Sequence, residues 1–86
     1  LDPATRRRFL DGLRPLARDD MTLILITHHI EEILPEMGRV VMMEDGRLAS
    51  EGDKADLLTD RALSELFGLA TRVEQTHDGW FSAHLG

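Results

Sequence analysis

The feature that most constrains the fold is an apolar run that ends in two histidines. Residues 22–27 are Leu, Ile and Thr with no alternating charged positions, and His28 and His29 follow directly. Such continuous apolar character is typical of a parallel strand that is covered on both faces. Ligands of open α/β sheets bind at the carboxyl ends of the strands, so His28 is a candidate ligand-binding residue. A structural histidine, satisfied by hydrogen bonds at a strand end, is the alternative.

The residues after this run predict a β-α-β unit. Ile30, Ile33 and Leu34 form the apolar stripe of a short helix, and residues 40–43 form a second buried strand. Residues 22–43 would then make a right-handed crossover. The pair Asp45-Gly46 predicts a hairpin that returns along residues 47–51.

A helix is predicted before this unit. Asp2 is a helix cap and Pro3 fits the first helical position. Pro15 is unfavourable in the helix interior and would kink the helix or end it early. The helix is expected to end near the polar turn at residues 18–20. The apolar face comprises Phe9, Leu10, Leu13, Leu16 and Ala17, and the basic cluster Arg6-Arg7-Arg8 is interpreted as a solvated face.

The C-terminal part predicts two helices and a second hairpin. Residues 53–58 form a short helix, and a further helix is capped by Thr59 or Asp60 and ends at Gly68. The hairpin pairs residues 72–76 with residues 80–83. Trp80 and Phe81 are interpreted as packing residues of the core or the hairpin.

Composition restricts the class of protein. The 86 residues suffice for one small domain or part of a larger one, and a net charge of -6 does not favour nucleic acid as a partner. The absence of cysteine excludes disulfides and thiolate metal sites. Two buried strands need more neighbours than this chain supplies, and the first residue is Leu1 rather than methionine. We therefore expect the C-terminal part of a longer protein.

The histidine region was also considered as a metal site. His28 and His29 lie at helical spacing from Glu32, but no third ligand has a comparable spacing, so no metal site is predicted. Glu31 and Glu32 are interpreted as first-turn acids favoured by the helix dipole. The chain contains no G-x-x-x-x-G-K-[ST], G-x-G-x-x-G or nucleophile-elbow pattern.

The order of these motifs resembles the C-terminal part of an ABC transporter ATP-binding subunit, from the end of the D-loop through the switch-histidine loop to the closing hairpin. The similarity lies in Leu1-Asp2, Thr5-Arg6, residues 22–28, Glu31-Glu32, residues 39–43, Asp45-Gly46-Arg47 and Glu51-Gly52. The resemblance implies an α/β fold that is part of a P-loop NTPase domain. Residues 1–59 would be the family-like core and residues 60–86 a C-terminal extension.

The resemblance also implies ATP hydrolysis that drives transport by a transmembrane partner, and it implies two site residues. His28 matches the switch histidine, a catalytic residue that contacts the γ-phosphate of ATP and helps to position the attacking water. Asp2 matches the last residue of the D-loop, at the interface of two ATP-binding subunits. The implied cofactors are ATP and Mg²⁺, and the implied partners are a second ATP-binding subunit and a transmembrane permease at the cytoplasmic face of the membrane, with no nucleic acid.

The resemblance leaves most of the ATPase machinery outside this chain. The phosphate-binding loop, the glutamine loop, the signature motif, the Mg²⁺-binding aspartate and the catalytic glutamate are expected before Leu1. We therefore expect the 86 residues alone to be inactive. Two alternatives remain open, namely a soluble ABC ATPase without a transport role and a non-catalytic α/β regulatory or interaction domain in which His28 is structural.

Overall fold

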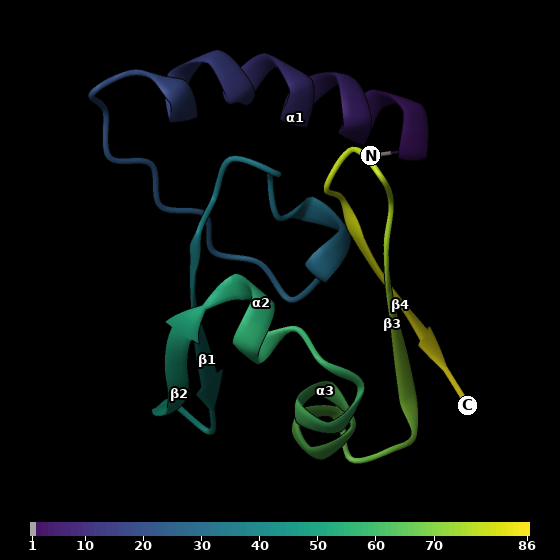
Figure 1. Cartoon of the computed structure of the whole chain (residues 1–86). Coiled ribbons are helices and arrows are strands. Elements are labelled where there is room, and N and C mark those ends of the chain that lie inside the picture. The colour runs from purple at the N-terminus through teal and green to yellow at the C-terminus, as the bar shows by residue number, and fades with distance from the viewer. Residues whose placement is uncertain (1) are drawn as a thin grey trace.

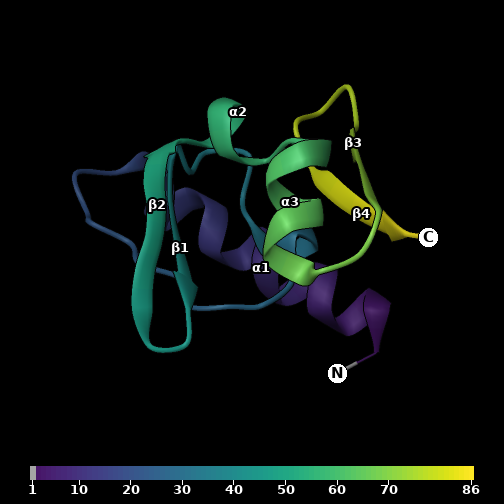
Figure 2. The same cartoon turned by 90° about the horizontal axis from the view of Figure 1, so that it is seen from below.

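The computed structural model describes residues 2–86, and the elements in this range are three α-helices, one short 3₁₀ turn and four strands. In chain order they are α1 (Pro3–Arg18), η1 (Ile30–Glu32), β1 (Arg39–Glu44), β2 (Arg47–Asp53), α2 (Lys54–Leu57), α3 (Asp60–Phe67), β3 (Thr71–Gln75) and β4 (Phe81–Leu85). Figures 1 and 2 show the β1–β2 hairpin and the β3–β4 hairpin on opposite sides of α2 and α3.

The first helix begins where its capping residues predict. Asp2 has extended backbone angles, and its carboxylate accepts a hydrogen bond from the Thr5 amide at 2.9 Å. Pro3 follows at the first helical position, where its missing N–H leaves no donor unsatisfied. The helix continues through Pro15 and ends at Arg18, so the polar turn, not the proline, terminates it.

Only part of the predicted apolar face of α1 is buried. Leu10 is buried, and Leu13 and Ala17 pack around the same cluster. Phe9 is 59% exposed and Leu16 is 38% exposed. The helix therefore covers the remainder of the described chain with a narrower stripe than its sequence predicts.

The β1–β2 hairpin confirms the prediction made from Asp45-Gly46. Asp45 has φ 52° and Gly46 has φ 74°, so both turn residues are left-handed, as a two-residue type I′ turn requires. Antiparallel pairing runs from Glu44 opposite Arg47 to Arg39 opposite Asp53, with an irregularity between Met42 and Met43.

The burial of β1 differs from the prediction. Residues 40–43 were expected to be buried throughout, but only Met42 is buried, while Val41 and Met43 are 54% and 56% exposed. The cause is the sheet itself. Among residues 2–86, β1 has β2 on one edge and no strand on the other, so one face and one edge stay uncovered.

The predicted strand at residues 22–27 is not formed, and the β-α-β prediction is wrong for this structure. The segment between α1 and η1 contains neither a helix nor a paired strand, and Ile24 and Ile26 are 79% and 93% exposed. A parallel strand needs hydrogen-bonded neighbours and covering layers. No strand within residues 2–86 pairs with this segment, so its apolar side chains have nothing to pack against on most sides.

The helix predicted around residues 30–34 is also much shorter than expected. It is a single 3₁₀ turn, η1, closed by a hydrogen bond from the Ile33 amide to the Ile30 carbonyl at 3.2 Å. Pro35 lies two residues after Ile33, and a proline disfavours helical geometry in the residue just before it. Ile30 and Leu34 are nevertheless buried, as their apolar pattern predicts.

The helices after the first hairpin form largely as predicted. The Thr59 hydroxyl caps α3 by accepting a hydrogen bond from the Ala62 amide at 3.1 Å. Gly68 ends α3 with φ 76°, a conformation that favours glycine. The helix α2 is shorter than the predicted span, and no side chain caps it.

The second hairpin is likewise confirmed. β3 and β4 pair antiparallel from Thr71 opposite Leu85 to Gln75 opposite Phe81. The turn contains Gly79 with φ 95°, and a Cβ placed there would lie 3.1 Å from Pro35 Cβ. Both the backbone angle and this close approach favour glycine at position 79.

Two buried clusters connect these elements. The larger one joins η1, the β1–β2 hairpin, the helical pair and β4, and it consists of Ile30, Met42, Leu58, Leu63 and Phe81. The smaller one lies under α1 and consists of Leu10, Leu34 and Trp80. Trp80 and Phe81 thus belong to the core, as predicted.

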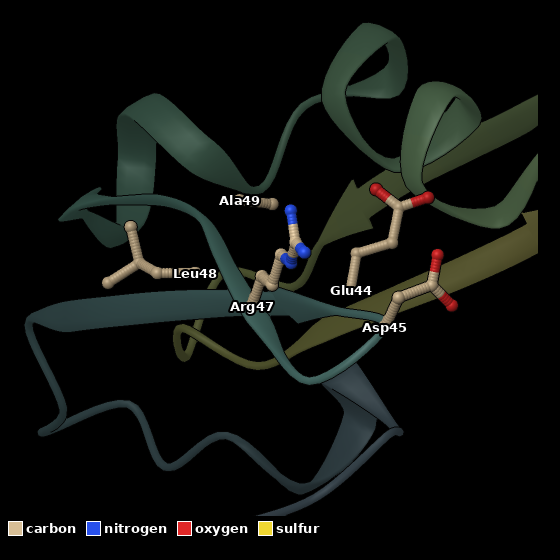
Figure 3. A pocket seen from close by; sticks show the side chains of 5 residues that line it. All are labelled: Glu44, Asp45, Arg47, Leu48 and Ala49. Atoms are coloured by element: carbon tan, nitrogen blue, oxygen red, sulfur yellow. The ribbon is translucent and has the colours of Figure 1, made fainter.

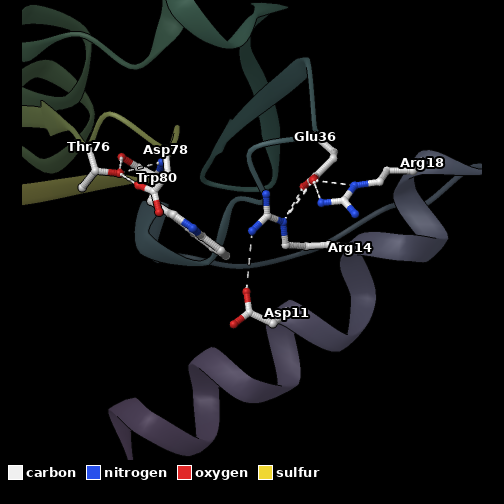
Figure 4. A network of polar contacts seen from close by, with 7 residues as sticks. All are labelled: Asp11, Arg14, Arg18, Glu36, Thr76, Asp78 and Trp80. Atoms are coloured by element: carbon white, nitrogen blue, oxygen red, sulfur yellow. Dashed lines mark hydrogen bonds and ion pairs between the residues drawn. The ribbon is translucent and has the colours of Figure 1, made fainter.

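Arg14, Arg18 and Glu36 form the main ion-pair cluster between α1 and the loop after η1. The Glu36 carboxylate accepts hydrogen bonds from Arg14 Nε at 3.0 Å and from Arg18 at 2.8 Å (Figure 4). Hydrogen bonding from Arg14, with a further contribution from Arg18, lowers the pKa of Glu36 to about 2. Figure 4 also shows Trp80 on the neighbouring turn, with the Arg14 guanidinium 5.6 Å from its ring.

None of the helices within residues 2–86 has both the length and the apolar composition needed to cross a bilayer.

Candidate functional site

His28 lies at the end of the extended segment, immediately before η1. Its side chain is exposed, as is that of His29, and their ring centroids are 4.5 Å apart with the planes tilted by 48°. An exposed imidazole can exchange protons and hydrogen bonds with a ligand. The catalytic and γ-phosphate-binding roles implied for His28 stay predictions.

Hydrogen bonds to the neighbouring residues restrain the backbone at His28. The Thr27 hydroxyl accepts a hydrogen bond from the His29 amide at 3.1 Å, so the bond spans His28. The same hydroxyl donates to a Glu32 carboxylate oxygen. The His28 turn, defined as residues 27–32, is thus closed by local contacts on both sides of the histidine.

Glu32 connects this turn to the first helix. Its second carboxylate oxygen lies 3.3 Å from Arg6 Nε, and the two side chains are 23% and 36% exposed, respectively. Arg6 is in the first turns of α1, and its amide donates to the Asp2 carbonyl at 2.9 Å. A continuous set of polar contacts therefore runs from Asp2 along α1 to the His28 turn.

Glu31 connects the same turn to the C-terminal hairpin. Its carboxylate accepts a hydrogen bond from the Ala83 amide of β4 at 3.0 Å. Ile30, one residue earlier, is buried in the same cluster as Phe81 of β4. The interpretation of Glu31 and Glu32 as helix-dipole acids is therefore incomplete, because each carboxylate has a specific partner.

Asp2 is an exposed helix cap with both carboxylate oxygens occupied. One accepts from the Thr5 amide at 2.9 Å and the other from the Thr5 hydroxyl at 3.0 Å. These hydrogen bonds, led by the one from the backbone, lower the pKa of Asp2 below its ordinary value. The capping role predicted from the sequence is confirmed, and the interface role implied by the resemblance stays a prediction.

An apolar groove of about 1000 Å³ lies between the extended segment and β1. His28 and His29 are among its lining residues, and the exposed side chains of Ile24, Ile26 and Val41 contribute to its apolar walls. An apolar groove between an unpaired segment and the free edge of β1 is what a sheet exposes when neighbouring strands are missing.

A smaller hollow of about 480 Å³ lies at the turn of the first hairpin (Figure 3). Its lining residues are Glu44, Asp45, Arg47, Leu48 and Ala49. None of the residues singled out for chemistry lies there. The candidate site is therefore the part of the larger groove that His28 lines.

The histidines and acids next to η1 are not gathered into a cluster of potential metal ligands. Residues 2–86 contain no group of three or more His, Asp or Glu side chains arranged to hold an ion. Glu32, the carboxylate common to both proposed pairs, instead contacts Thr27 and Arg6.

The residues present do not by themselves fit ATP and Mg²⁺. A nucleotide triphosphate is held chiefly by a loop of backbone amides with a lysine, and this chain has no sequence of that type. His28 offers one hydrogen-bonding group for a phosphate oxygen. The chain therefore supplies at most one part of a nucleotide site.

Sequence reasoning missed the residues that hold the site in place. Arg6 was interpreted as part of a solvated face, and neither Ala83 nor Glu36 was considered. Ala83, the partner of Glu31, lies 52 positions away in the sequence. Arg14 and Arg18, the partners of Glu36, lie 22 and 18 positions away, so no local pattern indicates these contacts. The Thr27–Glu32 spacing of five residues is also not a helical one.

Comparison with known proteins identifies the family. An uncharacterized ABC transporter ATP-binding protein of Bacillus subtilis, YlmA, is 30% identical over 91% of this chain and 30% of its own length. An energy-coupling factor transporter ATP-binding protein of Symbiobacterium thermophilum, EcfA2, is 36% identical over 80% of the chain and 24% of its own length. The methionine import ATP-binding protein MetN of Burkholderia thailandensis is 41% identical over 66% of the chain and 17% of its own length. No protein-family model matches the chain.

The chain thus spans less than a third of the length of these relatives. Each of them aligns with about two thirds or more of the chain. The chain belongs to the family of ABC transporter ATP-binding proteins, a branch of the P-loop NTPases.

Proposed function

We propose that this chain is the C-terminal part of an ATP-hydrolysing subunit that energises transport across a membrane. The support is the exposed imidazole of His28, held at the end of an apolar segment by a closed turn, in a chain related to ABC transporter ATP-binding proteins. In this function His28 donates a hydrogen bond to the γ-phosphate and helps to orient the attacking water. Phosphoryl transfer depends mainly on such positioning and charge stabilisation.

The remaining groups of the reaction belong to other parts of the whole subunit, meaning a polypeptide in which this chain follows a phosphate-binding loop and a catalytic glutamate. Those parts would hold ATP and Mg²⁺. In the whole subunit, residues 22–27 pair as a parallel strand and the apolar groove is filled by neighbouring strands. Residues 1–59 then complete the ATPase core, and residues 60–86 form a C-terminal extension.

Asp2 is proposed to lie at the interface with a second ATP-binding subunit, while it also caps α1. The energy-coupling factor and methionine import relatives support a transmembrane permease as the further partner, at the cytoplasmic face of the membrane. The residues of this chain do not specify the transported substrate.

The decisive experiment is ATP hydrolysis by the whole subunit carrying His28→Ala, with His29→Ala as the matched control. Both rings are exposed and adjacent, so general effects of losing an imidazole should be similar. We expect His28→Ala to lower kcat by about 100-fold or more and His29→Ala to change it by less than about threefold. Equal activity of the His28→Ala variant and the unmodified subunit would reject the catalytic role.

A second measurement addresses the 86-residue chain alone. We expect no ATP turnover above background, because the chain has no phosphate-binding loop. Turnover that disappears on His28→Ala in this chain would contradict the proposal that the other groups lie elsewhere.

A further inference from the structure

The His28 turn is fixed between two elements that are far apart in the sequence. Figure 1 shows the turn in the middle of the molecule, between α1 and the C-terminal hairpin. Glu32 faces Arg6 of α1, and Glu31 faces the Ala83 amide of β4. Two adjacent carboxylates thus attach one turn to both ends of the described chain.

The contact through Glu32 reaches the backbone around His28 by way of Thr27. Glu32 accepts from the Thr27 hydroxyl with one oxygen and pairs with Arg6 through the other. The Thr27 hydroxyl in turn accepts the His29 amide across His28. Loss of the Glu32 charge would break the pair with Arg6, so the turn that carries the imidazole would no longer be attached to α1.

The contact through Glu31 uses an otherwise unpaired strand amide. Val73 and Ala83 are opposite each other in the β3–β4 ladder, yet the Val73 amide donates to Asp60 at 2.8 Å and the Ala83 amide donates to Glu31 at 3.0 Å. Both amides therefore point out of the hairpin toward carboxylates. Asp60 and Glu31 hold the hairpin from its two edges, so the position of β4 and that of the His28 turn depend on each other.

We propose that Glu31 and Glu32 are positioning residues for His28, and that the C-terminal hairpin thereby contributes to the rate of ATP hydrolysis. This proposal rests on the proposed catalytic role of His28. Neither carboxylate touches the nucleotide. Each fixes the direction in which the imidazole points, and misplacement of a catalytic group by about 1 Å can lower a rate by up to about 100-fold.

The first test is the Glu32→Gln variant of the whole subunit, with kcat and KM measured for MgATP. We expect kcat to fall about tenfold and KM to stay within about twofold, because binding depends on groups other than His28. The matched control is Glu65→Gln, which removes the carboxylate of an exposed ion pair with Arg61 at 3.5 Å and should leave kcat unchanged.

The double variant His28→Ala/Glu32→Gln separates positioning from a merely structural role. If Glu32 acts through His28, the double variant has the same kcat as His28→Ala alone, because the imidazole is already absent. Multiplied losses would overturn the proposal. If His28→Ala itself leaves kcat unchanged, the proposed function fails. If His28→Ala lowers kcat strongly while Glu32→Gln and Glu31→Ala have the kcat of the unmodified subunit, only the positioning role is rejected.

Glu31 offers a second pair of variants should Glu32→Gln fail to fold. The amide oxygen of Glu31→Gln can still accept the Ala83 hydrogen bond, so kcat should stay within about twofold, whereas Glu31→Ala removes the acceptor and should lower kcat about fivefold. Equal kcat values for Glu31→Ala and Glu31→Gln would contradict the role of the hairpin contact.

Discussion

Residues 39–85 and residues 21–29 both contain many apolar side chains, but they differ in how they are stabilised. The former contain two hairpins and two helices whose caps, turns and pairing partners lie close by in the sequence. The latter contain the most apolar run of the chain, yet no strand within residues 2–86 pairs with it and Ile26 is 93% exposed. Apolar composition alone therefore does not make a strand, because the hydrogen-bonded neighbour has to be present.

The histidine lies where these two regions meet. The extended segment carries His28 on its exposed end, while η1 directly after it is attached to the core through Ile30. On its C-terminal side His28 is thus followed by a turn that is packed into the core, and on its N-terminal side it is preceded by an unpaired segment. The following substitutions test this contrast, beginning with the largest expected change in the free energy of unfolding.

Leu63→Ala should have the largest effect. Leu63 is 1% exposed in the larger cluster, and truncation of a buried leucine lowers the free energy of unfolding by about 2–5 kcal/mol. Leu85→Ala is the matched control, since Leu85 is 63% exposed and should change stability by less than about 1 kcal/mol. Urea denaturation of the chain measures both. Similar losses would show that the cluster around α3 is not the stable region.

Glu36→Gln should lower the free energy of unfolding by about 1–2 kcal/mol at neutral pH, because it removes charge-assisted hydrogen bonds to Arg14 and Arg18. Glu65→Gln removes a carboxylate from an exposed pair and should cost less than about 0.5 kcal/mol. If the two variants have the same unfolding midpoint in urea, the Glu36 cluster does not attach α1 to the loop.

The contribution of Glu36 should also depend on pH in a defined direction. The pKa of Glu36 is lowered from 4.5 to about 2 in the folded chain, so the folded state favours the charged carboxylate. Its stabilisation is complete above about pH 4.5 and is lost as the pH falls toward 2. The stability difference between the unmodified chain and Glu36→Gln should therefore shrink over this range. A difference that grows on acidification would contradict the sign of the shift.

Gly46→Ala should lower the free energy of unfolding by about 1 kcal/mol, because Gly46 has φ 74° in the hairpin turn. Gly12→Ala is its opposite, since Gly12 lies within α1 and a Cβ there meets nothing within 4 Å. It should raise stability by about 0.5–1 kcal/mol. Thermal denaturation of both variants gives the signs, and a stabilising Gly46→Ala would refute the turn assignment.

Ile26→Thr should have the smallest effect, within about 0.5 kcal/mol, because the side chain is 93% exposed in this chain. In the proposed whole subunit the same substitution should cost more, since the segment would be a covered strand there. Amide hydrogen exchange at Ile24 and Ile26 provides the companion measurement, with little protection expected in the chain alone. Strong protection at these amides would mean that the segment finds a pairing partner after all.

The elements that could be predicted are those determined by neighbouring residues. Asp2, Thr59 and Gly68 cap helices as their residue types indicate, and Asp45-Gly46 forms its turn, because each depends on backbone angles and hydrogen bonds within a few positions. The strand predicted at residues 22–27 does not form in this structure, because its formation depends on non-local pairing.

The candidate site shows the same division. The place of His28 after an apolar run makes it a candidate from the sequence alone, and its side chain is exposed. The contacts that hold it, from Glu31 to Ala83 and from Glu32 to Arg6, cross the chain without any sequence pattern. They could be recognised only once the hairpin and α1 were placed around the turn.

Trp80, the single tryptophan of the chain, has a practical consequence. Its ring is 3% exposed beside Leu10 and Leu34, with the Arg7 guanidinium 4.0 Å from its centroid. Intrinsic fluorescence of this protein therefore comes from one reporter, located where the C-terminal hairpin meets α1. A red shift of its emission would signal separation of the two, so the protein carries its own optical probe of that junction.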